Sequence, residues 1–182
     1  MRGFFLTILI GLLVFSAIAA DTDQFDIVVQ CHFLDISLKE SASHTTDFTE
    51  WDMGMVAAGS GIDIMPVPDH IWVDNGYNVN INVSAYLSSP TPSACGYGTA
   101  TPWTPGSSAG ADQFMLDLGI GDASTQPSVW TNITSTSTPG DIYETVIPAG
   151  DDHDLYARFQ VPTTVSDGCP HTITVYIVAT PF

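Results

Sequence analysis

The 182-residue sequence predicts an all-β protein, an antiparallel β-sandwich of seven to nine strands, on three observations. First, apolar and polar residues alternate along several segments, which puts successive side chains on opposite faces of a sheet. Second, the composition favours strands and turns over helices, because seventeen of the twenty acidic residues are Asp and only three are Glu. Third, turn signals such as Asn75-Gly76 and Pro139-Gly140 separate the alternating segments, and no window after the N-terminal segment has helical periodicity.

The N-terminus predicts a secretory signal peptide. Arg2 supplies a positive charge, residues 4–18 are apolar, and Ala17-Ile18-Ala19 is a small-residue cleavage site. The apolar run of about 15 residues is shorter than the roughly 20 that a membrane span needs. We therefore expect a signal peptide over residues 1–20, one secreted domain over residues 21–182, and no transmembrane segment in the mature protein. The alternative is a pilin-type prepeptide cut after Gly3, which would retain the apolar segment as a helix; Ile8, not Glu, then stands at the fifth position.

Four segments carry the alternating pattern, at residues 25–33, 77–87, 153–161 and 171–180. In each, one set of alternate residues is apolar and is expected to face the core, while the set between them, which includes Tyr156 and Arg158, is expected to face outward. Residues 88–110 have no strand pattern and are predicted to form a long surface loop. The residues expected to face inward are Phe25, Ile27, Val29, Cys31 and Phe33; Tyr77, Val79, Ile81, Val83, Ala85 and Leu87; Leu155, Ala157, Phe159 and Val161; and Ile173, Val175, Ile177 and Ala179.

A sequence pattern in residues 51–81 adds a resemblance. The stretch W-D-M-G-x-V-x-x-G-S at 51–60, followed by V-x-N-G-x-x-V-x-I at 73–81, resembles bacterial and archaeal Ig-like extracellular surface domains, and more loosely camelysin/TasA-type fibre subunits. The likeness covers about residues 45–90 and implies an Ig-like sandwich, but it indicates no particular activity. From the residues themselves, Trp51, Met53 and Met55 are expected to alternate toward the core. The matching residues are Trp51, Asp52, Gly54, Val56, Gly59, Ser60, Val73, Asn75, Gly76, Val79 and Ile81.

The charge and the motifs argue against nucleic-acid binding and enzymatic activity. Lys and Arg number 3 against 20 Asp and Glu, for a net charge of −17, which disfavours a phosphate-backbone partner and favours salt, divalent cations or a cationic partner outside the cell. Residues 106–110 satisfy G-x-S-x-G, but no strand pattern precedes them and no helix pattern follows. The five histidines are scattered. We predict a protein that is not an enzyme and has no cofactor, unless Ca²⁺ binds.

Three kinds of modification or metal site are predicted. The turn residues Asp151, Asp152 and Asp154 offer oxygen ligands of the kind Ca²⁺ prefers, although acidic turns before strands are common. Cys95 and Cys169 lie in turn-rich segments and are favoured as a disulfide in an oxidising compartment; pairing of Cys31 with either, or no bond, remains open. Asn82 and Asn132 begin N-x-S/T sequons at positions expected to face outward, although such sequons also arise by chance.

Two classes of function follow. The first is a structural surface protein, a self-assembling filament or envelope subunit that forms a homopolymer by strand addition to the open sheet edge of a neighbour. The alternative for the donor strand is that it folds back as the first strand of its own domain. The second class is an extracellular ligand-binding module, for carbohydrate for example, which uses Tyr97, Trp103 and Trp130. The proposed donor residues are Phe25, Ile27, Val29, Cys31 and Phe33.

Overall fold

The computed structural model describes residues 36–66, 70–76, 78–88, 90–93 and 100–182 of the chain. Within these ranges the secondary structure consists of β-strands, turns and bends, so the all-β prediction is confirmed. The same ranges contain no helix long and apolar enough to cross a membrane. The predicted signal peptide and the proposed donor strand at 25–33 lie outside the described residues.

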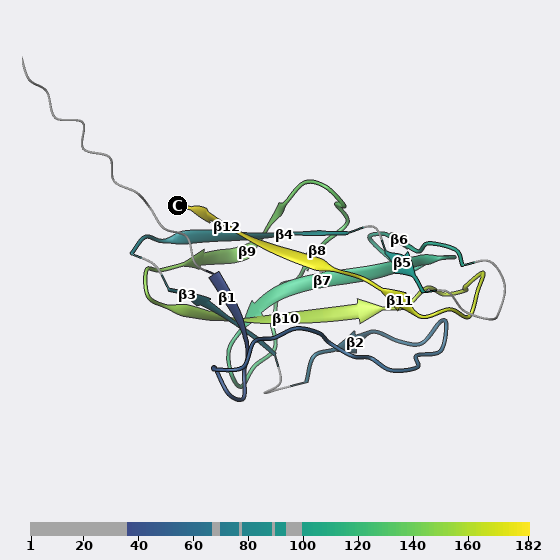
Figure 1. Ribbon diagram of the computed structural model, residues 1–182, viewed down its shortest axis with the longest axis horizontal. Coiled ribbons are helices and arrows are strands. Elements are labelled where there is room, and N and C mark those ends of the chain that lie inside the picture. The colour runs from purple at the N-terminus through teal and green to yellow at the C-terminus, as the bar shows by residue number, and fades with distance from the viewer. Residues whose placement is uncertain (1–35, 67–69, 77, 89, 94–99) are drawn as a thin grey trace, which may run out of the picture. The chain divides into compact units, whose positions relative to one another are not determined.

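The larger of the two main sheets has the order β1-β3-β10-β7-β6, and two short strands join it from the side, β2 on β10 and β8 on β7 (Figure 1). Its pairings are antiparallel except that between β6 and β7, which is parallel. The bounds are β1 Ile36–Glu40, β2 Asp63–Ile64, β3 Ile71–Asn75, β6 Thr104–Pro105, β7 Gln113–Gly121, β8 Thr131–Asn132 and β10 Asp152–Gln160.

The smaller sheet is antiparallel and has the order β12-β4-β9, and a separate two-stranded ladder joins β11 to β5. Seven of the described strands have five or more residues, in agreement with the seven to nine that were predicted. The bounds are β4 Ile81–Leu87, β5 Thr91–Pro92, β9 Gly140–Ile147, β11 His171–Thr172 and β12 Val175–Pro181.

The order of the long strands differs from that of an immunoglobulin constant domain. There the first, second, fifth and fourth strands share one sheet. Here β10, the sixth of the seven long strands, lies between β3 and β7, and β9, the fifth, pairs with β4 in the other sheet. The two sheets are therefore arranged in a sandwich-like way, but the order of their strands is not that of an immunoglobulin constant domain.

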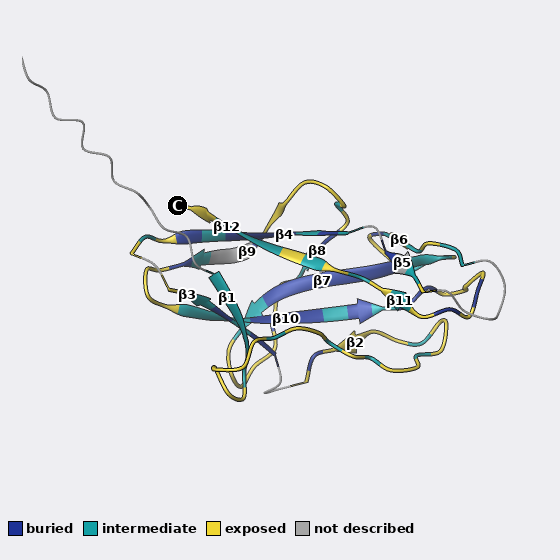
Figure 2. Cartoon of the chain, viewed as in Figure 1, coloured by how far each residue is buried: buried dark blue, intermediate teal, exposed yellow. Residues whose placement is uncertain are grey.

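The hydrophobic core joins the two main sheets in one cluster (Figure 2). Alternation explains it, because one face of β4 and one face of β10 meet across the cluster. Residues predicted to face inward on β4, and in the β10 segment through Val161, are buried, which confirms those assignments. On β12 the predicted inward residues pack against the cluster but remain partly exposed. The buried set is Ile81, Val83, Ala85 and Leu87 together with Leu155, Ala157, Phe159 and Val161.

The prediction that Tyr156 faces outward is wrong. Its side chain is fully buried, its ring lies 4.6 Å from the ring of His70, and its hydroxyl donates a hydrogen bond of 2.8 Å to the carbonyl of Asp122. Loop residues thus cover the outer face of β10 here, and the ring fits because Gly121 has no side chain: an added Cβ would lie 2.8 Å from Tyr156 Cε2. Burial, followed by the charges of Asp154 and Asp122, raises the pKa of Tyr156.

The motif at 51–60 does not form the expected strand. Gly54 and Gly59 have φ values of 60° and 75°, in the left-handed region where a chain changes direction, and the Gly54 N–H donates to Asp52 Oδ1 at 2.8 Å. Alternation therefore fails after Met53. Trp51 and Met53 pack against the core as expected, whereas Met55 is fully exposed, contrary to the prediction.

Candidate functional site

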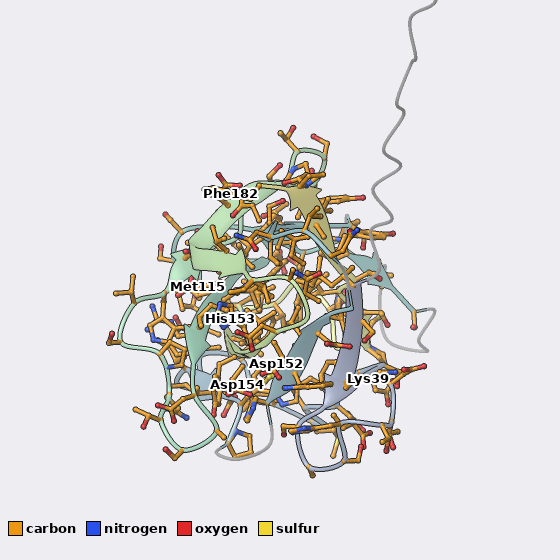
Figure 3. All side chains as sticks on the ribbon, turned by 90° about the vertical axis from the view of Figure 1, so that its left-hand side faces the viewer. Lys39, Met115, Asp152, His153, Asp154 and Phe182 are labelled. Carbon is orange, nitrogen blue, oxygen red and sulfur yellow. The ribbon has the colours of Figure 1, made fainter. Side chains whose placement is uncertain are left out.

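The three acidic residues proposed for Ca²⁺ lie at the start of β10. Asp151 precedes the strand and accepts the backbone N–H of Asp152 at 3.0 Å, and Asp152 and Asp154 follow on the strand with His153 between them (Figure 3). Asp154 Oδ1 lies 2.5 Å from His70 Nε2, so this carboxylate already has a partner. Among the residues with described side chains, no group of three or more His, Cys, Asp or Glu is placed to hold a metal ion. Calcium binding here stays a prediction.

His70 is the side chain of this region that sequence reasoning did not select. It is 3% exposed, its Nδ1 has no hydrogen-bond partner, and its backbone N–H donates to Ser41 Oγ at 3.0 Å. Since Ser41 Oγ bonds to the backbone of His70, these contacts are not those of a Ser-His-Asp nucleophile relay, which requires a ring nitrogen on the hydroxyl. His70 and Asp154 are 84 residues apart and share no local motif, so only the folded chain reveals the pair.

A polar ladder crosses three neighbouring strands of the larger sheet. The carboxylate of Asp117 on β7 accepts a hydrogen bond from Arg158 Nε on β10 at 2.7 Å and another from Asn132 Nδ2 on β8 at 2.6 Å. The Arg158 guanidinium also lies 4.8 Å from the centroid of the Trp130 ring. These four side chains, the Asp117 ladder, are a structural network in which the only arginine of the described residues is neutralised.

The two predicted glycosylation sites have different environments. Asn132 is partly exposed, and its Nδ2, the atom that a glycan would need, donates to Asp117 Oδ1 at 2.6 Å within the ladder. Asn82 lies on β4, and its Nδ2 donates to Asp141 Oδ1 at 2.9 Å on the exposed surface. Modification of either asparagine stays a prediction, and the geometry favours Asn82.

Trp103, one of the aromatic residues proposed to bind a ligand, is in contact with other residues of the domain. The Trp103 ring stacks on His171 with centroids 4.0 Å apart, and Trp103 also packs against the core. The His171 ring in turn bonds to Asp167, 3.2 Å between Nε2 and Oδ1. Trp130 is engaged by Arg158, and Tyr97 lies outside the described residues. One face of the Trp103 ring is therefore covered by His171, and the Trp130 ring is in contact with the Arg158 guanidinium.

Asp167 ties two loops to this aromatic cluster. Its carboxylate accepts backbone N–H groups from Thr101 and from Cys169, and these bonds, that of Thr101 first, lower the pKa of Asp167 below its ordinary value of 3.8. Cys169 is 7% exposed and disulfide-bonded. Cys31 and Cys95 both lie outside the described residues, so the pairing of Cys95 with Cys169 stays a prediction.

We expect the substitution Asp167→Asn to weaken the dependence of the free energy of unfolding on pH at acidic pH. A carboxyl with a lowered folded-state pKa stabilises the fold fully above its unfolded value, near 3.8, and that contribution is lost as pH falls through the lower folded value. As the pH is lowered from about 4 to about 2, the urea concentration at the unfolding midpoint of the wild-type protein should therefore decrease. The midpoint of the variant should decrease less over the same interval. An equal loss in both proteins would contradict the assignment.

A shallow groove of about 450 Å³ lies beside β2. Six of its eight lining residues are apolar, and two of these, Met55 and Ile64, are exposed to solvent. Its lining residues are Trp51, Met53, Met55, Val56, Ala57, Ser60, Asp63 and Ile64.

A second apolar surface follows β12, the last strand of the smaller sheet. Val175, Ile177 and Ala179 pack against the core but are only partly buried, in contrast to the fully buried row on β4 next to them (Figure 2). Ile36 and Leu38 of β1, which ends the order of the larger sheet, are partly buried in the same way. The hydrophobic core is therefore less covered along these two end strands than in its centre.

Comparisons with known proteins assign no family. No family model and no solved structure matches the chain. A stretch of 68 residues is 35% identical to NADH-quinone oxidoreductase subunit N of Desulfovibrio desulfuricans, covering 37% of this chain and 14% of that protein. The chain thus spans a small part of that relative, which carries no conclusion about what this chain does.

Proposed function

We propose that the protein is a secreted structural subunit of the cell surface that associates with copies of itself by strand addition. The observation that carries the proposal is the incompletely covered core along β12, where Val175, Ile177 and Ala179 remain partly exposed. A strand with alternate apolar side chains would cover this surface, and residues 25–33 have that alternation. Addition of one chain to the next in a head-to-tail manner does not close, so it builds a fibre.

The test is the assembly state of residues 21–182. Purified protein should form polymers that are seen as ordered fibres by electron microscopy and as a broad high-mass population by light scattering. A matched protein in which Ile27 and Val29 are replaced by Asp should remain monomeric, because charged side chains cannot fill an apolar surface. A wild-type protein that stays monomeric at all salt concentrations and with Ca²⁺ would contradict the proposal.

Salt should promote assembly. Residues 21–182 carry a net charge of −18, one more negative than the full chain because Arg2 is absent. Copies therefore repel one another over the Debye length, which shrinks from about 30 Å at 0.01 M to about 3 Å at 1 M ionic strength. We expect the polymer fraction at fixed protein concentration to rise with NaCl. The measurement is sedimentation of polymer across a salt series; a polymer fraction that falls steadily with salt would show that attractive charge pairs, not apolar strand pairing, hold the copies together.

One observation favours the second candidate, a ligand-binding module. Tyr86 on β4 and Tyr176 on β12 stack with ring centroids 4.7 Å apart, and Tyr176 is 43% exposed. Aromatic faces on an exposed sheet are suited to sugar rings or other flat apolar groups. Saturable glycan binding that is lost in Tyr176→Ala and kept in Thr180→Ala would support this candidate.

A further inference from the structure

We infer that the acceptor for strand addition is the outer edge of β12, and that its occupant is residues 25–33 of a second copy of the chain. This inference rests on the proposed function and specifies the surface that it uses. Four properties of β12 carry it: the direction of its backbone groups, its lack of charge, its neighbours, and its position relative to the start of β1.

The backbone of β12 presents hydrogen-bonding groups to an open edge. Ser88 N donates to the Thr174 carbonyl at 2.8 Å and Phe182 N donates to the Asn80 carbonyl at 2.9 Å, which fixes the pairs that exchange hydrogen bonds with β4. Because such pairs alternate, Val175, Ile177 and Ala179 direct their N–H and C=O groups away from β4. These residues have no hydrogen bond on that side within the described part of the chain. The same three residues carry the partly exposed apolar side chains.

The end of the chain lacks the charges that normally protect an edge strand. Residues 172–182 contain no acidic or basic side chain, in a protein with 20 acidic residues. Natural edge strands are usually blunted by charge, by bulges or by a covering segment, because bare edges pair with other chains. An uncharged edge strand with an apolar flank is therefore suited to receive a strand.

The other two end strands of five or more residues, β1 and β9, are less suited. The outer side of β1 is already occupied, since Phe48 N donates to the Leu38 carbonyl at 2.9 Å and Glu40 N donates to the Thr46 carbonyl at 2.8 Å. The third end strand, β9, carries Asp141 and Glu144 within its eight residues. Of the three, only β12 combines an open backbone edge with an uncharged sequence.

The position of β1 favours a second copy over the same copy. Ile36 begins β1 opposite Asn75, and β12 finishes near Asn80, so β1 starts at the end of the domain where β12 stops. To reach β12 of its own molecule, a strand at 25–33 would have to reverse within Leu34-Asp35, which lacks the Gly found in the dipeptides that favour tight two-residue reversals. A strand that continues past this end enters the next molecule without a reversal.

The lengths are compatible. Residues 25–33, fully extended, span about 30 Å, whereas the seven residues of β12 span about 23 Å. The donor segment is therefore long enough to cover the whole acceptor strand. Its apolar residues recur at every second position, as do those of the β12 flank.

The first test uses Ala179→Pro in residues 21–182. Proline removes the N–H that points to the open edge and leaves the hydrogen bonds to β4 intact, so the variant should keep the melting temperature and circular dichroism of the wild type. Its association constant for polymer growth should fall about tenfold or more, equivalent to the loss of one edge hydrogen bond. The control Ala179→Ser keeps the N–H and should assemble normally. Normal assembly of a folded Ala179→Pro protein would overturn the inference.

The second test does not depend on how that variant folds. A photo-reactive phenylalanine analogue at Phe25 or Phe33 is irradiated in a mixture of ¹⁵N-labelled and unlabelled chains, and the cross-linked peptides are sequenced by mass spectrometry. Cross-links to residues 173–181 of the other isotopic form are expected. Cross-links within one copy, or to β1 or β9, would overturn the acceptor assignment while polymers persist and the proposed function stands. The absence of polymer in every condition would instead overturn the proposed function itself.

Discussion

The substitution Asn75→Asp should lower the free energy of unfolding by about 4 kcal/mol, because three buried carbonyl groups lose their amide donor. Asn75 is fully buried at the end of β3, and its Nδ2 lies 3.0, 3.1 and 2.8 Å from the carbonyl oxygens of Val79, Ile147 and Pro148. A carboxylate there has no proton to donate and faces three oxygen atoms. Asn75→Ala should cost less, about 3 kcal/mol, since it removes the donor without adding charge.

Urea denaturation followed by tryptophan fluorescence measures both variants, and a pH series separates them. In Asn75→Asp the neutral carboxyl can still donate one hydrogen bond, so burial raises its folded-state pKa and the variant loses stability as pH rises above the unfolded value near 3.9. Asn75→Ala should show no such added slope. The control is Asn78→Asp, at an exposed position close in sequence, with an expected change within about 0.5 kcal/mol. Equal effects at the two positions would contradict the role of Asn75.

Removal of Asp117 should have the second largest effect, a loss of about 3 kcal/mol for Asp117→Ala. This carboxylate is 3% exposed and is the shared acceptor of the Asp117 ladder, for Arg158 Nε and for Asn132 Nδ2. Without it, the guanidinium of Arg158 keeps its charge in a partly buried position and Asn132 loses an acceptor. The cost comes mainly from the partners left behind, not from the strength of the ion pair itself.

That distinction can be measured. The double variant Asp117→Leu with Arg158→Met removes both charges and should be more stable than Asp117→Leu alone, because no unpaired charge remains. A matched surface control is Asp47→Ala, which breaks the exposed pair with Lys39 and should cost less than about 1 kcal/mol. If the double variant proved less stable than Asp117→Leu alone, the unpaired charge of Arg158 would not be the source of the loss.

The strands with strict alternation were predictable from sequence, whereas contacts between distant segments were not. The inward residues of β4 and β10 follow from period-two patterning because each strand has one apolar face on the core. Tyr156 is buried although it belongs to the set of β10 residues predicted to face outward, because a loop carrying His70 covers that face of the strand. No residue near Tyr156 in the sequence predicts that contact. The segment around Met55 fails for a local reason, since a left-handed glycine ends the alternation that a strand would need.

The polar residues show the same division. Asn75-Gly76 reads as a turn signal, and a turn does follow β3, but the buried role of Asn75 depends on carbonyls more than 70 residues later. The partners of Asp117 and Asp154 likewise come from other segments of the chain, 41 and 84 residues away. Sequence spacing predicts which side of a strand a residue occupies. It does not predict which residue of a distant segment will contact that side chain.

The two basic residues of the described chain, Lys39 and Arg158, have a consequence for proteolysis. Trypsin-type proteases cut after Lys or Arg, and beyond Arg2 the chain offers only Lys39 and Arg158. Lys39 lies between β3 and the segment around Asp47, and Arg158 lies between β2 and β7, so each cleavage site is paired on both sides. Such a protease reaches either bond only after the sheet opens. Under reducing conditions, which open the disulfide of Cys169, a cut at Arg158 would then release the last 24 residues, β12 among them. Digestion would therefore report both on the opening of the fold and on the fate of its final strand.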